Sequence, residues 1–265
     1  MKRRNITAII IFIIFYVSFG AYLTLNQEKI IYQPFAQDFD SCQAFSGAQK
    51  VDEAGTRMYV SGTSKPVVVL YHGNAGSACD RWFYANLFQQ AGYDFVIVEY
   101  AGYSNDDREP SHTLIRQDVK NVITWLERSS ITDVTIVGES IGTGVASYHT
   151  YLKPPRQLLL ITPFTDLATI ARQRFWFYPT SLLVENAYDN VTALATYQGK
   201  THIIHGENDT LIPYALGREL YETLPGEKTF VTIPDAGHNN LFASPDTIPA
   251  IQTFLKPEVI SLNED

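Results

Sequence analysis

The feature of this sequence that most constrains its fold is a series of short apolar segments, rich in β-branched residues, that alternate with helical segments. The first two are VVVLYH at 67–72 and DFVIVEY at 94–100. Four more follow, at 134–138, 158–162, 201–206 and 228–233. Short apolar runs without polar alternation are typical of parallel strands buried on both faces. The alternation predicts an α/β fold in which helices cover both faces of a mostly parallel sheet.

Helices are expected between these strands. Their predicted ranges are 77–91, 111–128, 140–151, 213–223 and 246–255. The segment 111–128 gives the clearest signal, because its apolar residues recur at helical spacing. Two further short strands are predicted near 30–32 and 57–60, ahead of the regular series. Sites in such a sheet form at the carboxyl ends of its strands, so the loops there are the first candidates for function.

One segment interrupts the alternation. Residues 166–198 lie between the fourth and fifth strands of the series and are too long for a simple loop. We interpret this insertion as a small helical lid. It carries an aromatic cluster, Phe175, Trp176, Phe177 and Tyr178, and Phe164 lies just before it. These residues either form an apolar substrate pocket or simply pack the lid onto the sheet.

The N-terminal segment differs from the rest of the chain. Basic residues at 2–4 precede an uncharged run at 6–25. About 20 helical residues rise roughly 30 Å, which matches the hydrocarbon core of a bilayer. The basic flank predicts a cytoplasmic N-terminus, with the domain at 26–265 on the other side of the membrane. A cleaved signal peptide is the alternative to a membrane anchor at 1–25, but the apolar run at 6–25 is longer than a typical signal sequence carries.

Composition excludes several classes of protein. A length of 265 residues suits one large domain with a short appendage. The net charge of −8 argues against nucleic acid, whose phosphates require a basic face. No zinc-ligand spacing occurs, so no metal is expected. The two cysteines, Cys42 and Cys79, either pair in an oxidising compartment or remain two separate buried thiols.

A G-x-S-x-G pattern at 138–142 carries the main chemical signal. It follows a predicted buried strand and opens a helix of small residues, which is the setting of a nucleophile elbow. Such a turn holds its serine, here Ser140, in a strained backbone conformation. The residues two positions away must then be nearly without side chains, as Gly138 and Gly142 are. The sequence therefore predicts Ser140 as a nucleophile.

Two backbone N–H groups are expected to stabilise an oxyanion beside Ser140. Ile141, the residue after the nucleophile, supplies one. The loop HGNA at 72–75 ends the first strand of the series, and Asn74 is predicted to supply the other. His72 in the same loop is expected to have a structural role.

The remaining catalytic groups are predicted from the last two strand ends. Asp209 follows the fifth strand of the series, and His238 lies in the loop after the final strand, with a glycine before it. Their chain order of nucleophile, acid and base is the one this fold requires. Asp166 is a competing acid, because it lies after the fourth strand, and His205 is expected only to line the site. His238 would take the proton of Ser140, and Asp209 would orient the imidazole.

With these motifs in place, the sequence resembles the α/β-hydrolase fold family. It looks like the membrane-anchored branch that includes the eukaryotic ABHD depalmitoylases and many uncharacterised bacterial serine hydrolases. The resemblance rests on six segments, HGNAG, EYAGYSNDDREPS, GESIGTG, TPFTDL, HGENDTLIP and AGHNNL. It implies Ser140, Asp209 and His238 as the triad, and palmitoyl-protein hydrolysis as one activity. Ala101 stands where relatives usually carry Arg, which puts the bracing of its loop in question.

The sequence thus predicts a serine hydrolase, without a cofactor, that cleaves carboxylic esters or thioesters of an acyl substrate such as a lipid or lipidated protein. A peptidase specific for N-terminal residues is an alternative, with Glu139 or Asp166 binding the amine. A non-catalytic binding module is another, although such proteins usually lack a triad member. A glycosylation sequon at Asn208 lies beside Asp209, which favours a bacterial periplasm or cell envelope over an ER lumen. Secretion after signal cleavage is the other expected location.

Overall fold

The computed structural model of this chain describes residues 3–35, 37–185 and 188–256. Lys2 of the basic flank, residues 186–187 of the expected lid and the C-terminal end of the expected domain lie outside these ranges. The core is an eight-stranded sheet with the strand order β1-β2-β4-β3-β5-β6-β7-β8. The strands are β1 (Gln49–Glu53), β2 (Thr56–Val60), β3 (Val67–Tyr71), β4 (Asp94–Glu99), β5 (Val134–Glu139), β6 (Gln157–Ile161), β7 (Lys200–Gly206) and β8 (Lys228–Ile233).

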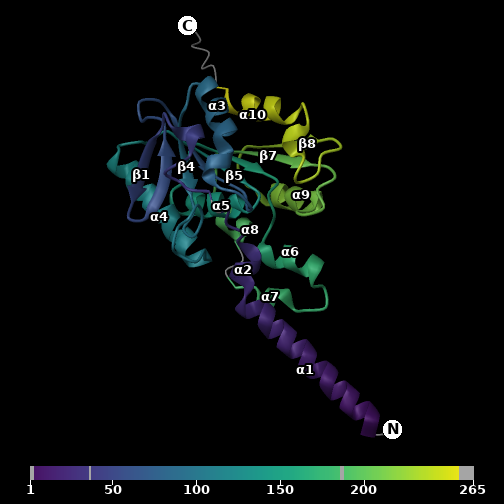
Figure 1. Cartoon of the computed structure of the whole chain (residues 1–265). Helices are drawn as coiled ribbons and strands as arrows, with labels where there is room; N and C mark the ends of the chain where they lie inside the picture. The colour runs from purple at the N-terminus through teal and green to yellow at the C-terminus, as the bar shows by residue number, and fades with distance from the viewer. Residues whose placement is uncertain (1–2, 36, 186–187, 257–265) are drawn as a thin grey trace.

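Six neighbouring strands, in the sheet order β4-β3-β5-β6-β7-β8, are parallel. Strand β2 pairs antiparallel with β4 on the other side. Helices cover both faces of this sheet (Figure 1). The main helices are α3 (Trp82–Gln90), α4 (His112–Arg128), α5 (Gly142–Leu152), α9 (Tyr214–Thr223) and α10 (Thr247–Leu255). The predicted α/β architecture, with a mostly parallel sheet between two helical layers, is confirmed.

Each face of the sheet has its own apolar core, and β3 contributes to both. Val67, Val69 and Tyr71 pack with residues of α4, α5 and α9, whereas Val68 and Leu70 pack with residues of α3 and α10. This division follows from the two-residue period of a strand. All five side chains are fully buried, and burial of one such side chain contributes about 1.5–3 kcal/mol.

The predicted strand near 30–32 is wrong, because these residues form the short helix α2 (Gln27–Ile31). This helix follows directly after α1 (Arg3–Leu25). The amide side chains of Asn26 and Gln27 donate to the carbonyls of Tyr22 and Thr24 at 2.8 and 2.9 Å, which supports helical backbone across the junction. Two isoleucines in sequence do not distinguish a strand from a helix of this length.

Strand β1 was not predicted, because QKVDE is polar and partly exposed at the edge of the sheet. It forms a hairpin with β2 through Ala54 and Gly55, whose φ angles are +52° and +87°. Two consecutive positive φ angles are typical of the tight turn that joins antiparallel strands. An exposed, charged edge strand of this kind also hinders pairing with other chains.

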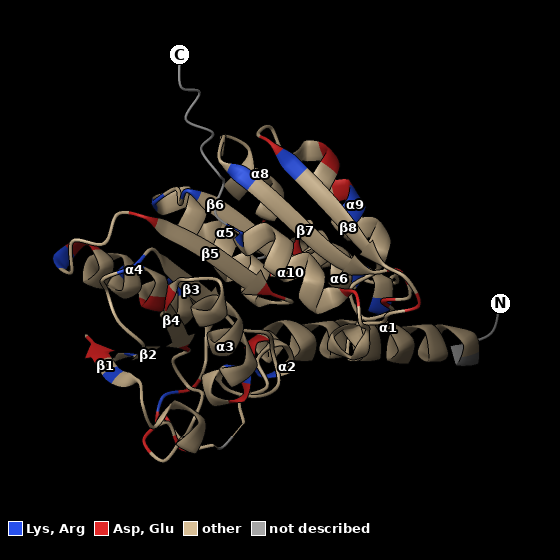
Figure 2. Cartoon of the chain, turned by 90° about the horizontal axis from the view of Figure 1, so that it is seen from above, with Lys and Arg blue, Asp and Glu red and all other residues tan. Residues whose placement is uncertain are grey.

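Helix α1 projects away from the sheet and carries no charged side chain between Asn5 and Leu25 (Figures 1 and 2). Its 21-residue span has a mean hydropathy of 2.4 and is almost entirely unburied by the rest of the chain. By length and composition it is able to cross a membrane, and a signal sequence would have the same properties.

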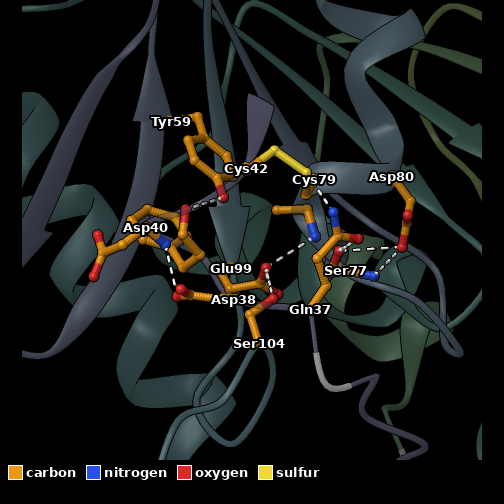
Figure 3. Close-up of a disulfide and its surroundings, with 12 residues drawn as sticks. Gln37, Asp38, Asp40, Cys42, Tyr59, Ser77, Cys79, Asp80, Glu99 and Ser104 are labelled. Carbon is orange, nitrogen blue, oxygen red and sulfur yellow. Dashed lines mark hydrogen bonds between the residues drawn. A yellow bond between two sulfur atoms is a disulfide. The ribbon is translucent and has the colours of Figure 1, made fainter. Parts of the chain in front are cut away.

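A disulfide joins Cys42 to Cys79, which resolves the alternatives left open by the sequence (Figure 3). The bond ties the segment before β1 to the 3-10 turn Ala78–Arg81 that precedes α3. Both sulfur-bearing side chains are buried beside Tyr59 and Phe45. Disulfides of this kind persist in oxidising compartments.

Removal of this disulfide is expected to lower stability markedly. The bond closes a loop with a sequence separation of 37, which corresponds to about 4 kcal/mol of lost denatured-state entropy. Cys42→Ala combined with Cys79→Ala should lower Tm, measured by thermal unfolding of the detergent-solubilised protein. Wild-type protein unfolded with a reductant is the control and should match the double variant. Equal Tm values with and without the disulfide would contradict the expectation.

Candidate active site

Ser140 occupies the sharp turn between β5 and α5, with a φ of +54°. A Cβ on Gly142 would lie 2.2 Å from the Tyr71 carbonyl, and one on Gly138 would lie 2.6 Å from the Gly142 carbonyl. Only glycine fits at both positions, as the sequence pattern implied. The turn therefore packs directly against the end of β3 while the serine is held in an uncommon backbone conformation.

The structure brings three of the predicted residues into one hydrogen-bonded chain. Ser140 Oγ lies 2.9 Å from His238 Nε2, and His238 Nδ1 lies 2.7 Å from Asp209 Oδ2. The three residues follow β5, β8 and β7 respectively, so the carboxyl ends of separate strands converge here. Asp209 is buried and Ser140 is 9% exposed. This arrangement has the geometry required for a base to take the proton of an attacking hydroxyl.

Asp209 is held in its ionised form by its surroundings. Burial alone would raise the pKa of Asp209, but hydrogen bonds from His205 and His238 and the backbone N–H of Ile212 lower it well below its usual range. Its second oxygen accepts from the N–H groups of Leu211 and Ile212 at 2.9 and 2.8 Å. His205 Nε2 lies closer to the Ile212 carbonyl, at 2.9 Å, than to Asp209, at 3.5 Å. The backbone donors therefore fix the carboxylate that faces His238.

Asp166 has a different position. It is the N-cap of α6 (Leu167–Arg174), where its two oxygens accept from the N–H and hydroxyl of Thr169 at 2.8 and 2.7 Å. A capping carboxylate of this kind satisfies backbone donors that the helix leaves unpaired. The geometry therefore brings Asp209, rather than Asp166, to the imidazole of His238.

The loop after β3 lies against the nucleophile. A Cβ on Gly73 would lie 3.4 Å from the Cβ of Ser140, so this backbone passes beside the serine. Within the described residues, the backbone N–H groups of Asn74 and Ile141 donate no hydrogen bond to another protein group. Ile141 also lies at the N-terminus of α5, where the helix dipole favours negative charge.

The Asn74 side chain holds this loop in place. Its Oδ1 accepts from the N–H of Gln33 and the hydroxyl of Tyr103, each at 2.8 Å. His72 is fully buried, stacks on Tyr100 and contacts the Gly73 carbonyl through Nδ1 at 2.8 Å. These contacts fit the structural role expected of His72.

An apolar cavity of about 500 Å³ opens beside Ser140. Phe164, Phe175 and Tyr178 lie in its wall, as the pocket prediction requires. Trp176 and Phe177 do not line it, and their side chains are 78% and 44% exposed. The helices of the expected lid, α6, α7 (Thr180–Leu183) and α8 (Asn190–Leu194), occupy the insertion after β6.

Sequence reasoning missed the other wall of the cavity. The end of α1 and helix α2 contribute five residues, Leu23, Thr24, Gln27, Ile30 and Ile31. The signal available was the pair of isoleucines immediately after the apolar run, which the strand prediction obscured. The N-terminal segment is therefore part of the site as well as a possible anchor. In the described part of the chain, no group of three or more histidine, cysteine or acidic residues is arranged to hold a metal.

The loop at 100–108 is braced without the usual arginine. Asp118, on α4, accepts from the Ala101 N–H at 2.8 Å and from the Thr56 hydroxyl at 2.7 Å. Arg57 donates to the carbonyls of Tyr103 and Ser104, and Arg108 bonds Asp106. Burial raises the pKa of Asp118 to about 6, although these hydrogen bonds oppose the rise.

Comparison with known proteins agrees with the fold. A family model of the alpha/beta hydrolase fold matches residues 66–183. The solved structures of Est1E from Butyrivibrio proteoclasticus with ferulic acid and of the hydrolase MGS-M2 align with TM-scores of 0.64 and 0.61, at 16% and 17% identity. These alignments cover 79% and 78% of this chain and 96% of each of the other chains. The chain therefore has an α/β-hydrolase fold.

Several curated proteins are similar to this chain in sequence. An uncharacterized protein of Mycobacterium tuberculosis is 28% identical over 87% of both chains. The lysophosphatidylserine lipases ABHD12 of Gallus gallus and Bos taurus are 28% and 29% identical over 73% of this chain, and the matches cover 59% and 56% of their own lengths. The chain therefore shares the α/β-hydrolase fold and is similar in sequence to ABHD-type lipases.

Replacement of Asp118 by Asn tests the buried brace. The folded pKa of about 6 lies above the ordinary aspartate value of 3.8, so the folded protein retains this proton more readily than the unfolded chain. The protonated carboxyl of Asp118 stabilises the fold at pH values below the unfolded pKa. This contribution of roughly 3 kcal/mol is lost as the pH rises through about 6. Relative to wild type, Asp118→Asn should gain stability by that amount between pH 4 and pH 7, measured by urea unfolding.

The exposed Asp107 lies in the same loop and provides a matched control. Asp107→Asn should leave the pH dependence of the unfolding free energy unchanged. An Asp118→Asn protein with the wild-type pH profile would show that the buried carboxyl does not titrate in this range.

Proposed function

We propose that this chain is a membrane-anchored serine hydrolase that cleaves the carboxylic ester of an acyl amphiphile. The observation that carries the proposal is the hydrogen-bonded chain from Ser140 through His238 to Asp209, at the mouth of an apolar cavity. Neither the hydrogen-bonded chain nor the cavity alone is sufficient to propose a reaction, because histidine and carboxylate pairs also occur in structural networks. A nucleophile, a base and an adjacent pocket together define a reaction class.

The mechanism proceeds through an acyl-enzyme. His238 takes the proton of Ser140 as the serine oxygen attacks the ester carbonyl, and Asp209 stabilises the imidazolium that forms. The N–H groups of Asn74 and Ile141 stabilise the oxyanion of the tetrahedral intermediate. Protonated His238 then gives its proton to the leaving alcohol. Water, activated by the same histidine, hydrolyses the acyl-enzyme and releases the fatty acid.

The cavity supports a substrate with one apolar chain and a polar head. Its volume lies within the usual range of ligand pockets, and its wall is mostly aliphatic and aromatic. Arg174 is the one charged residue among the described residues that line it. An anionic group beside the ester would meet this guanidinium. The ABHD12 relatives are named lysophosphatidylserine lipases, which supports the same class of monoacyl phospholipid.

Thioesters of lipidated proteins remain a second substrate class, because the same serine chemistry cleaves them.

The alternative activity, a peptidase specific for N-terminal residues, receives no support from the cavity. Glu139 pairs with Arg81 at 3.2 Å, and Asp166 caps α6. No carboxylate among the described residues lines the cavity to bind an amine.

The proposed location is a membrane with the domain on its oxidising side. Helix α1 supplies the span, and the basic residues before it favour a cytoplasmic N-terminus. The disulfide between Cys42 and Cys79 supports the same orientation. A bacterial periplasm or cell envelope meets both conditions.

Labelling with a fluorophosphonate probe tests the triad. Ser140→Ala in the full-length, detergent-solubilised protein should abolish labelling, because the probe reacts with the activated serine. Asp209→Asn should lower turnover by roughly 10³–10⁴-fold, because the histidine loses its orientation and charge partner. Asp166→Asn is the matched control, since asparagine also caps helices well, and it should retain nearly full turnover. Loss of activity in Asp166→Asn alone would reverse the assignment of the acid.

Turnover of matched acyl substrates tests the substrate class. We expect a lysophospholipid to be hydrolysed with a higher kcat/KM than a diacyl phospholipid, a palmitoyl thioester peptide or an aminoacyl amide. Arg174→Gln should raise KM for an anionic lysophospholipid and leave a neutral monoacylglycerol unaffected. Faster cleavage of the thioester would assign the chain to lipidated proteins instead.

A further inference from the structure

The lid is attached to helix α1 by a specific set of contacts. The Tyr16 hydroxyl donates to the Phe177 carbonyl, and the Tyr178 hydroxyl donates to the Tyr16 carbonyl, each at 2.6 Å. The rings of Tyr16 and Tyr178 also stack, with centroids 4.4 Å apart. A Cβ on Gly20 would lie 2.8 Å from the Tyr178 ring, so the glycine permits this close approach. The lid and α1 therefore form one packed unit, as their positions in Figure 1 show.

These contacts lie well inside the apolar span. Tyr16 and Gly20 precede Leu25, the last residue of α1, by nine and five residues. At 1.5 Å per residue, they lie about 14 and 8 Å from that end of the helix. If α1 crosses a bilayer, the lid tip at this level lies below the headgroups and within the acyl-chain region.

The surface of the lid tip, residues 175–183, suits a position among the acyl chains of a bilayer. Trp176 and Leu182 are 78% and 81% exposed, and Phe177 is 44% exposed. Leu182 and Trp176 are the two most exposed large apolar side chains outside α1 and α2 in the described part of the chain. Exposed apolar side chains that gather in one segment normally mark an interaction site. The segment contacts α1, whose apolar side chains are also exposed, which indicates that one apolar medium covers both.

Most backbone N–H and C=O groups described in the lid tip form hydrogen bonds within the protein, as a lipid environment requires. The N–H groups of Tyr178, Thr180, Leu182 and Val184 donate to carbonyls of the same segment at 2.8–2.9 Å. Pro179 has no N–H to satisfy. The Phe177 carbonyl accepts the Tyr16 hydroxyl instead of water.

Charge supports the same location. Residues 167–184 contain two arginines, Arg172 and Arg174, and no carboxylate, in a chain with a net charge of −8. Both arginines lie in the last turn of α6, just before the apolar tip. Basic side chains at the boundary of an apolar segment bind lipid phosphates and extend their guanidinium groups to the headgroup level.

We infer that residues 175–183 are a second membrane-embedded segment, and that the cavity between this segment and α1 takes its acyl chain directly from the bilayer. The inference rests on the proposed anchor and deepens the proposed function. Leu23 and Thr24 of α1 and Leu183 of the lid line the same cavity, which connects to Ser140. The substrate is therefore a membrane amphiphile whose chain moves sideways from the bilayer into the cavity.

Tryptophan quenching by brominated lipids tests this position without requiring activity. The chain has three tryptophans, Trp82, Trp125 and Trp176. Trp82→Phe retains Trp176, whereas Trp176→Phe retains Trp82, which is half exposed at the start of α3. Trp125 is present in both variants, so its emission is a common background.

Each full-length variant is reconstituted in vesicles of phosphatidylcholine with or without bromines on the acyl chains. We expect the Trp82→Phe protein to lose most of its Trp176 emission in brominated vesicles, and the Trp176→Phe protein to lose almost none. Equal, weak quenching of both variants would overturn the inference, because Trp176 would then lie in water.

Fluorophosphonate labelling of the protein in the same vesicles distinguishes failure of the embedded lid from failure of the proposed function. Labelled protein with unquenched Trp176 would keep the hydrolase and discard the embedded lid. Unlabelled protein with quenched Trp176 would keep the embedded lid and discard the hydrolase.

Discussion

The close packing of the β5–α5 turn against the end of β3 is the constraint on which the site depends. Gly142 lies so near the carbonyls of Tyr71 and His72 that any side chain there would collide with backbone. This contact sets the position of the proposed nucleophile, Ser140, relative to the loop that carries Asn74. The nucleophile and the proposed oxyanion donors therefore share one rigid support at the centre of the sheet, where β3 and β5 pair. Preorganised donors of this kind contribute most when the backbone that holds them does not move.

The central architecture could be predicted from the sequence because it follows from local patterns. Buried strands such as β3 and β4 are continuous apolar runs, and α4 has clear helical spacing with Ser111 as its N-cap. The elbow was also visible, since only glycine satisfies its sterics. The convergence of Asp209 and His238 near Ser140 required, in addition, the general rules of parallel sheets.

Other features depend on contacts that a sequence does not contain. Helix α2 ends in two isoleucines that also suit a short strand, and its conformation follows from side-chain bonds to α1 and from its place in the cavity wall. Trp176 and Phe177 belong to an aromatic cluster in sequence, but successive residues of a turn point in different directions, so only some reach the cavity. Asp166 and Asp209 both follow strands, and only the tertiary structure distinguishes a helix cap from a partner of His238.

The placement of the cavity has an energetic consequence for the proposed reaction. An acyl chain that enters an aqueous site must first leave the bilayer, at about 0.8 kcal/mol for each methylene group exposed to water. For a chain of about 14 methylenes this cost approaches roughly 11 kcal/mol. A cavity whose walls are α1 on one side and the lid on the other keeps the chain in apolar surroundings throughout. The binding energy of the chain is then available to hold the ester beside Ser140, rather than to compensate for its transfer through water. The same argument explains why the N-terminal helix is part of the site: if residues 1–25 were removed, this wall of the cavity would lose Leu23 and Thr24, and the apolar path to Ser140 would open to solvent.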